Sequence, residues 1–219
     1  MSTNQAADHK LDGISEEEKR SALNKVVTSS FLGTFIEWLD YGSYSYIAGI
    51  IALLFFPSSD RLLSMMMTFA VFAIAFFVRP LGAIFWGNFG DKRGRKAALS
   101  LSILIMSGAT FLIGCLPDIY TIGIIAPILL FILRILQGFS ASGEYAGAST
   151  FIAEYAPTNR RGFYCSMVPA STAAGLAVAL VFYTVMVSLT GFSAANAQAT
   201  PIVTDWLWRI PFWLAGPLG

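Results

Sequence analysis

The chain has 219 residues, of which 56% are hydrophobic and only 12% are charged, and its mean hydropathy is +0.66. Soluble domains carry about 25% charged residues, so this composition is typical of a membrane protein. The net charge of +1 argues against a nucleic-acid partner. The only histidine, His9, lies in a polar N-terminal segment, so we expect no metal, no cofactor and no enzymatic activity.

Long apolar runs begin after residue 25. Residues 1–25 are polar and of mixed charge, and we interpret them as a cytoplasmic tail without a cleaved signal peptide. An apolar run of about 20 residues can cross the hydrocarbon core of a bilayer. We therefore expect helices over residues 26–56, 62–86, 97–116, 121–155 and 163–189, and the start of another near residue 206.

The last of these helices is too short to span a membrane. Only 14 residues remain from Trp206 to Gly219, whereas a span needs about 20. We thus predict an all-α membrane protein in which residues 26–219 form a truncated N-terminal bundle of five spanning helices and the start of a sixth. Kinks or close helix contacts are expected at Gly138, Gly143 and Gly147, and bends at Pro169 and Gly175.

A basic stretch, Gly-Asn-Phe-Gly-Asp-Lys-Arg-Gly-Arg-Lys, occupies residues 87–96 between two apolar runs. We predict a short loop at the membrane surface, in which glycines 87, 90 and 94 permit tight turns. Ten of the 14 basic residues fall in the tail, in this loop and after the fourth helix, against two, Arg61 and Arg209, on the opposite side. This asymmetry places the N-terminus in the cytoplasm.

The two cysteines are expected at opposite faces of the membrane. Cys115 falls at the outer end of the third helix and Cys165 near the inner start of the fifth. That separation is far beyond the reach of a disulfide, about 7 Å between Cα atoms. We therefore expect two free thiols.

Five ionisable residues lie within the predicted spans. Each costs at least about 2.5–3.5 kcal/mol at mid-bilayer, so such groups face a protein interior or a water-filled path and usually have partners. Glu37 and Asp40 share one helix face with Tyr41 and Tyr44. Two carboxylates this close titrate as a coupled pair, and proton-coupled transport requires a carboxylate that binds and releases a proton. The other three ionisable residues are Arg79, Arg134 and Glu144.

Depth along the helices suggests partners for these charges. At 1.5 Å per residue, Arg79 lies about 12 Å from Gly87 and Glu144 about 20 Å from Pro157, so we expect them to be neighbours. Arg134 lies about 35 Å from Pro157, whereas Asp40 lies about 21 Å from Val26. Depth alone therefore leaves two alternatives for Arg134, a buried role or snorkelling to the outer face.

Residues 87–96 resemble the loop between helices 2 and 3 of the major facilitator superfamily, through the pattern Gly-x-x-x-Asp-x-x-Gly-Arg-Lys. Six further motifs are similar to the metabolite:proton symporters of that superfamily, and they lie at residues 33–41, 77–82, 134–138, 142–145, 151–157 and 208–212. Residues 120–130, followed by the fourth-helix motif at residues 134–138, look most like the proline/betaine transporters. Carriers of 2-oxoglutarate, citrate or shikimate share most of these motifs.

The resemblance implies roles for several of these residues. By similarity to proton-coupled sugar transporters, Asp40 pairs with Arg134. The inner charge cluster that locks the helix ends in the outward-facing state would comprise Asp91, Arg95, Glu154 and Arg161, with Gly87, Gly94 and Lys96 completing the inner gating motif. Ser142 departs from the branch, which often has glycine there. The family's cavity lies between two six-helix bundles, so a missing C-terminal half would be needed for transport.

The sequence therefore predicts a proton-coupled symporter for a small osmolyte such as proline or glycine betaine, in the bacterial inner membrane. Asp40 and Glu37 would carry the proton, with Arg134 as counter-ion. The expected partners are membrane lipid, protons and the solute, which would be bound by Trp38, Tyr41, Tyr44 and Glu144. One alternative is an organic-acid symporter, for 2-oxoglutarate, citrate or shikimate, with Arg134 or Arg79 on the substrate carboxylate. An alternative of another class is a non-transporting fragment or assembly partner.

Overall fold

The structure is a computed structural model that describes residues 16–142, 149, 152–153, 156–192 and 201–218. Within these residues all regular secondary structure is helical. The elements are α2 (Glu16–Tyr46), α3 (Ala48–Phe55), α4 (Arg61–Arg93), α5 (Arg95–Cys115), α6 (Ile119–Ile122), α7 (Ile125–Ala141), the 3-10 turn η1 (Thr158–Arg160), α9 (Arg161–Cys165), α10 (Met167–Thr190), α11 (Pro201–Asp205), the 3-10 turn η3 (Leu207–Arg209) and α12 (Ile210–Leu218).

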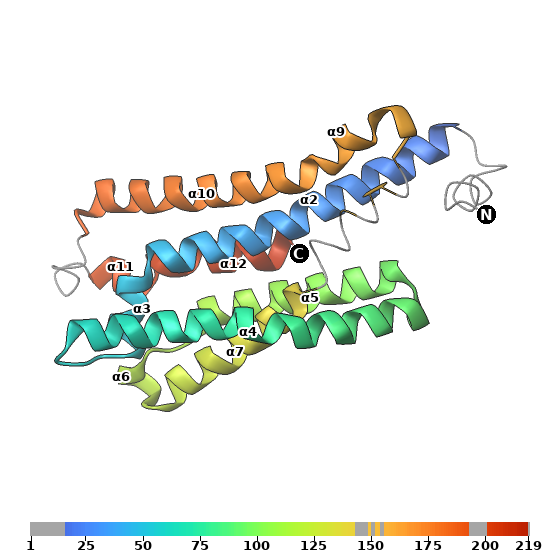
Figure 1. Cartoon of the computed structure of the whole chain (residues 1–219). Helices are drawn as coiled ribbons and strands as arrows, with labels where there is room; N and C mark the ends of the chain where they lie inside the picture. Colours follow the sequence, from blue (N-terminus) through green and yellow to red (C-terminus); the bar gives the residue numbers. More distant parts are fainter. Residues whose placement is uncertain (1–15, 143–148, 150–151, 154–155, 193–200, 219) are drawn as a thin grey trace.

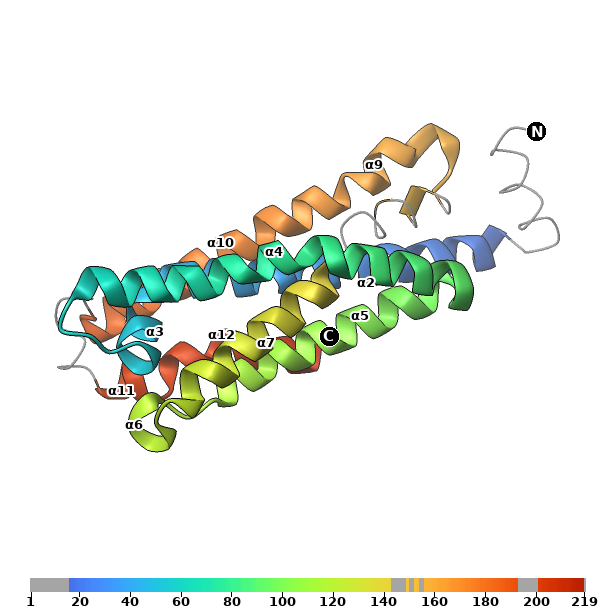
Figure 2. The ribbon, with the colours of Figure 1, turned by 60° about the horizontal axis from the view of Figure 1, so that its bottom comes forward.

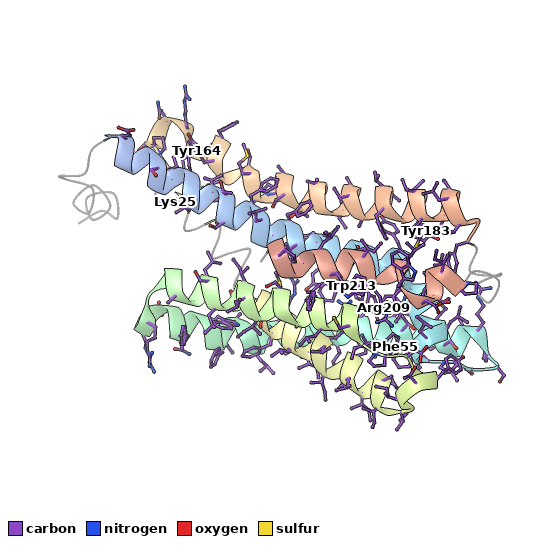
Figure 3. All side chains as sticks on the ribbon, turned by 180° about the vertical axis from the view of Figure 1, so that it is seen from behind. Lys25, Phe55, Tyr164, Tyr183, Arg209 and Trp213 are labelled. Atoms are coloured by element: carbon purple, nitrogen blue, oxygen red, sulfur yellow. The ribbon has the colours of Figure 1, made fainter. Side chains whose placement is uncertain are left out.

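The long helices lie side by side (Figures 1 and 2). Helix α10 packs along α2, α4 packs along α7, and α5 contacts both α7 and α12. The start of α2, the α4–α5 turn and α9 lie at one end of the bundle, and α3, α6 and α11 lie at the other. Figure 3 shows Lys25 and Tyr164 at the first end and Phe55 and Tyr183 toward the second.

Among the described residues, three helices are long and apolar enough to cross a membrane, over residues 61–93, 97–115 and 158–190. Helix α7 is also apolar but shorter. It begins at Ile125 rather than near residue 121, because Gly123 adopts a left-handed conformation (φ 64°) that separates α6 from it.

The first helix begins ten residues earlier than predicted, at Glu16 instead of Val26. Residues 16–25 contain three Glu, two Lys, one Arg, one Ala and one Leu, which favour helix although the segment is polar overall. Leu23 is buried in a small cluster with Ile152, Ala156 and Val168. The apolar run therefore marked the start of the lipid-facing part and not the start of the helix.

The predicted loop over residues 87–96 is wrong, because α4 continues as a helix through Arg93 and α5 begins at Arg95. Only Gly94, with φ 94°, makes the turn. Gly87 is an exposed helical residue with no atom close to the position of an added Cβ. A helix of 33 residues is about 50 Å long, so it extends beyond a hydrocarbon core of about 30 Å.

Gly138 and Gly175 both make close contacts inside continuous helices. A close contact is one of the two alternatives predicted for Gly138, whereas the bend predicted at Gly175 is wrong. A Cβ added at Gly138 would lie 2.1 Å from the carbonyl oxygen of Ala75, where α7 crosses α4. One added at Gly175 would lie 2.7 Å from the carbonyl oxygen of Phe35, where α10 crosses α2. The fifth helix is interrupted at Ser166, between α9 and α10, rather than at Pro169. Gly143 and Gly147 lie outside the described residues.

The last elements cover one end of the core. Trp208 and Phe212 are fully buried, and Trp208 packs edge-on against Phe55. Arg209 donates from Nη1 to the carbonyl oxygens of Gly114 at 2.8 Å and Leu116 at 2.6 Å, at the end of α5. The segment after residue 206 is therefore anchored to α5. Cys115 and Cys165 are both free thiols, as predicted.

Candidate intramembrane coupling and binding site

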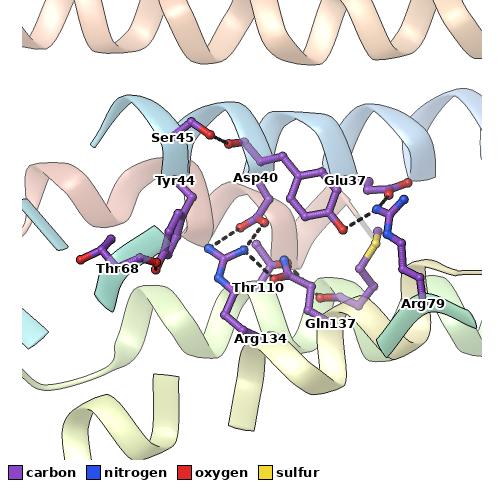
Figure 4. Close-up of polar contacts among 11 residues, drawn as sticks. Glu37, Asp40, Tyr44, Ser45, Thr68, Arg79, Thr110, Arg134 and Gln137 are labelled. Carbon is purple, nitrogen blue, oxygen red and sulfur yellow. Dashed lines mark hydrogen bonds and ion pairs between the residues drawn. The ribbon is translucent and has the colours of Figure 1, made fainter. Parts of the chain in front are cut away.

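Helix α2 presents four polar side chains to α4, α5 and α7. Glu37, Asp40, Tyr41 and Tyr44 lie three or four residues apart, so they fall on one face. All four are between 0 and 4% exposed. Figure 4 shows that Arg79 and Arg134 approach this face at two separate points.

Asp40 and Arg134 form a sealed ion pair. Nη1 of Arg134 donates to Oδ2 of Asp40 at 2.6 Å, and the two side chains are 1% and 0% exposed. The same nitrogen donates to Oε1 of Gln137 at 2.7 Å, and Nε2 of Gln137 donates to Oγ1 of Thr110 at 2.6 Å. A polar chain thus links α2, α7 and α5 across the apolar interior.

The snorkelling alternative for Arg134 is therefore wrong. The depth mismatch came in part from the boundary of the first helix; the depth of Arg134 was also counted along a helix expected to reach residue 155, whereas α7 ends at Ala141. Counting from Glu16 instead of Val26 adds about 15 Å to the depth of Asp40 and brings it close to the depth estimated for Arg134.

Tyr44 supports this ion pair. The guanidinium of Arg134 lies 4.0 Å from the centre of the Tyr44 ring. Phe72 stacks on the Tyr44 ring at 5.2 Å, and the hydroxyl donates to the carbonyl oxygen of Thr68 at 3.0 Å. Tyr44 is 0% exposed, so in this conformation its ring positions Arg134 and presents no open face to a solute.

Glu37 belongs to a second ion pair. Nη2 of Arg79 donates both to Oε1 of Glu37 and to the hydroxyl of Tyr41, the latter at 2.5 Å. The guanidinium also contacts the rings of Tyr41 and Phe76, with centroid distances of 5.1 and 4.9 Å. The sequence predicts Glu144 as the neighbour of Arg79. Glu144 lies outside the described residues, and the partner that the structure gives Arg79 is Glu37.

The two carboxylates therefore have one arginine each. Glu37 is 2% exposed, but its partner Arg79 is 27% exposed, unlike the sealed Arg134. Trp38 is partly exposed and meets Tyr41 edge-on at 5.9 Å. The site thus combines two neutral ion pairs: Asp40–Arg134 is fully buried, and Glu37–Arg79 is partly exposed through its arginine.

The proposed inner gating motif is only partly described. Asp91 is exposed and Arg161 is partly exposed. The side chains of Arg95 and Lys96, and the whole of Glu154, lie outside the described residues. The predicted charge cluster therefore stays a prediction.

Sequence reasoning missed Thr110 and Phe76 and gave Gln137 no role. Gln137 could have been found, because an amide three residues after Arg134 in an apolar helix lies next to it on the same face. Thr110 and Phe76 carry no such signal, since threonine and phenylalanine are ordinary residues in a membrane span.

The chain matches the family described as "Sugar (and other) transporter" over residues 25–219. The proline/betaine transporter of Escherichia coli K12 is 43% identical over 197 residues, and that of Salmonella typhimurium is 41% identical over the same length. The glycine betaine/proline/ectoine/pipecolic acid transporter of Dickeya dadantii is 42% identical over 197 residues. Each match covers 90% of this chain but only 38% of the relative.

This chain therefore spans about two fifths of the length of these relatives. The family match nevertheless covers both ion pairs and the long helices, except for residues 16–24 at the start of α2. The relatives agree with the resemblance carried by the sequence motifs. The chain belongs to the sugar (and other) transporter family of the major facilitator superfamily.

Proposed function

We propose that this chain is the N-terminal bundle of a proton-coupled symporter for a small zwitterionic osmolyte such as proline or glycine betaine. The names of the relatives support the substrate class, because they are called transporters of proline, betaine and related solutes. The observation that carries the coupling is the sealed Asp40–Arg134 pair, with side chains 1% and 0% exposed.

A buried ion pair of this kind would couple proton binding to a conformational change. Protonation of Asp40 would leave Arg134 as an uncompensated buried charge. Breaking a buried pair in this way costs about 3–5 kcal/mol. A state in which Arg134 finds another partner then becomes favourable, so the proton shifts the population between two conformations.

The bundle also suits a multi-pass membrane protein. We propose five spans, formed by α2 with α3, then α4, α5, α7 and α10, followed by the start of a sixth at α11 and α12. The α4–α5 turn, which follows Lys92 and Arg93, lies at the same end of the bundle as α9, which begins at Arg161 (Figure 1). Basic residues favour the cytoplasmic face, so this end, with the N-terminus, would face the cytoplasm of a bacterial inner membrane.

Alternating access needs a second bundle that moves against this one. The partly exposed face around Arg79 would form one wall of the substrate path, and a second bundle would form the opposite wall. The greater length of the relatives supports this arrangement.

Asp40→Asn in the full-length transporter containing this chain tests the coupling. The variant should lose uphill uptake driven by a proton gradient but keep exchange of labelled substrate, because exchange needs no net proton movement. Asp60→Asn, at the exposed start of α4, is a control that should retain uphill uptake. Undiminished accumulation by Asp40→Asn would remove Asp40 from the mechanism.

The second candidate is an organic-acid symporter, which the partly exposed Arg79 favours because a guanidinium binds carboxylates well. Competition in the same uptake assay separates the two candidates. Inhibition by 2-oxoglutarate or citrate, with none by proline or glycine betaine, would establish the organic-acid function and exclude the osmolyte function.

A further inference from the structure

Arg79 lies in the middle of a long helix and remains partly open. It stands about 27 Å along α4 from Arg61 and about 21 Å from Arg93, and its side chain is 27% exposed. A guanidinium at mid-bilayer depth is too costly to face lipid. This face of α4 must therefore meet water or protein, and a solute arriving by an aqueous path would reach Arg79 before the sealed Arg134.

The Glu37–Arg79 ion pair has unused hydrogen-bonding capacity. Both of its described side-chain hydrogen bonds, to Glu37 and to Tyr41, leave from Nη2. Among the described residues, Oε2 of Glu37 and Nε of Arg79 are buried without a hydrogen-bond partner. Nε of Arg134 is likewise buried without a partner, but Nη1 and Nη2 of Arg134 both reach Asp40. A buried polar atom without a partner costs free energy, and a polar ligand would recover it.

We propose that Glu37 and Arg79, with the exposed ring of Phe76, form the subsite that binds the zwitterionic substrate, while the buried Tyr41 positions Arg79 through its hydroxyl. The substrate carboxylate accepts hydrogen bonds from Arg79, and its cationic nitrogen lies toward Glu37. The Phe76 ring, which is 40% exposed beside the guanidinium, receives the methyl groups of a quaternary ammonium. This inference rests on the proposed function, and it assigns Glu37 to the substrate and leaves the proton to Asp40.

Charge balance makes such a subsite selective. Glu37 and Arg79 together are neutral, and a zwitterion keeps the subsite neutral. A monocarboxylate or an organic cation of the same shape would leave one uncompensated charge in a water-poor interior, which is strongly unfavourable. The pair therefore selects for a ligand with one charge of each sign.

The test measures competition against labelled glycine betaine in the full-length transporter, by binding and by exchange without a proton gradient. One competitor is 3,3-dimethylbutyrate, an anion with carbon in place of the nitrogen of betaine. The other is choline, which keeps the trimethylammonium group but lacks the carboxylate. The wild type should be inhibited by neither.

Each single variant should gain sensitivity to one competitor. Glu37→Gln leaves the subsite with one positive charge and should become sensitive to 3,3-dimethylbutyrate. Arg79→Gln leaves one negative charge and should become sensitive to choline. Both should bind betaine about 10- to 100-fold more weakly, since each loses one charged contact. Arg61→Gln, on the same helix but exposed at its start, should behave as wild type.

A gained sensitivity cannot come from a misfolded protein, so the switch is a positive signal. Arg79→Lys, which keeps the charge, should weaken betaine binding without any switch of competitor. Variants that reach the membrane and keep wild-type selectivity would overturn the subsite while leaving the symporter proposal intact. If Glu37→Gln lost only uphill uptake, Glu37 would serve the proton and the subsite would again be wrong. A wild type that neither binds nor exchanges betaine or proline would overturn both proposals.

Discussion

Replacing Gly138 by alanine should destabilise the bundle at the crossing of α7 and α4. The added Cβ would lie 2.1 Å from the carbonyl oxygen and 2.6 Å from Cα of Ala75. Ordinary contacts of a Cβ begin near 3.4 Å, so the helices must separate by about 1 Å. Both contact atoms are backbone, and no side chain can rotate away. Overpacking of this kind costs about 1–3 kcal/mol, which corresponds to a fall in Tm of about 2–12 °C for a chain of this size.

Thermal unfolding of the purified chain in detergent, followed by size-exclusion chromatography after heating, measures this effect. Gly108→Ala is the matched control, because Gly108 is an exposed position inside α5 with no atom within 4 Å of an added Cβ. The control should be unchanged or more stable by up to about 1 kcal/mol, since alanine favours helix over glycine. If Gly138→Ala unfolds at the same temperature as the control, the close crossing of α4 and α7 is wrong.

Three further predictions concern topology, the end of α5 and the isolated chain. In a background without Cys115 and Cys165, an impermeant thiol reagent applied to intact cells should modify Ser59→Cys and miss Lys92→Cys, and the reverse pattern would invert the orientation. Arg209→Ala removes two hydrogen bonds from a charged donor to the end of α5 and should lower Tm by about 2–12 °C, whereas an equal Tm for Arg209→Ala and Arg61→Ala would show that Arg209 anchors nothing. The 219-residue chain alone in liposomes should catalyse no proton-driven uptake, because alternating access needs two bundles; uptake without a second polypeptide would instead indicate a homodimer.

Apolar runs located the helices well but not their ends. The run that begins at Val26 missed ten helical residues, because Glu, Lys and Arg in residues 16–25 favour helix without being apolar. The run that ends at Trp86 missed seven, because Asp91, Lys92 and Arg93 continue α4 outside the apolar region. Hydropathy reports where lipid can lie against a helix, whereas the helix ends where its backbone hydrogen bonds end, here at Gly94.

These boundary errors explain why ion-pair partners could not be derived from depth. An error of seven to ten residues is about 10–15 Å along a helix axis. Glu37 and Asp40 are separated by only about 4.5 Å along that axis. Depth therefore could not decide which arginine serves which carboxylate. Resemblance to sugar transporters indicated Asp40 with Arg134, but nothing in the sequence indicated Glu37 with Arg79.

The placement of the two pairs on one helix has a consequence for coupling. Side chains three residues apart on a helix are neighbours, with Cβ atoms about 5–6 Å apart. A zwitterion at Glu37 and Arg79 and a proton on Asp40 would thus act on the same turn of α2, without a long relay through the bundle. Coupling free energies are reciprocal. If bound substrate favours protonation of Asp40 by a certain free energy, a proton on Asp40 therefore favours substrate binding by the same free energy. Asp40→Asn should accordingly abolish the pH dependence of betaine binding. It should leave unchanged the competitor selectivity that Glu37 and Arg79 set.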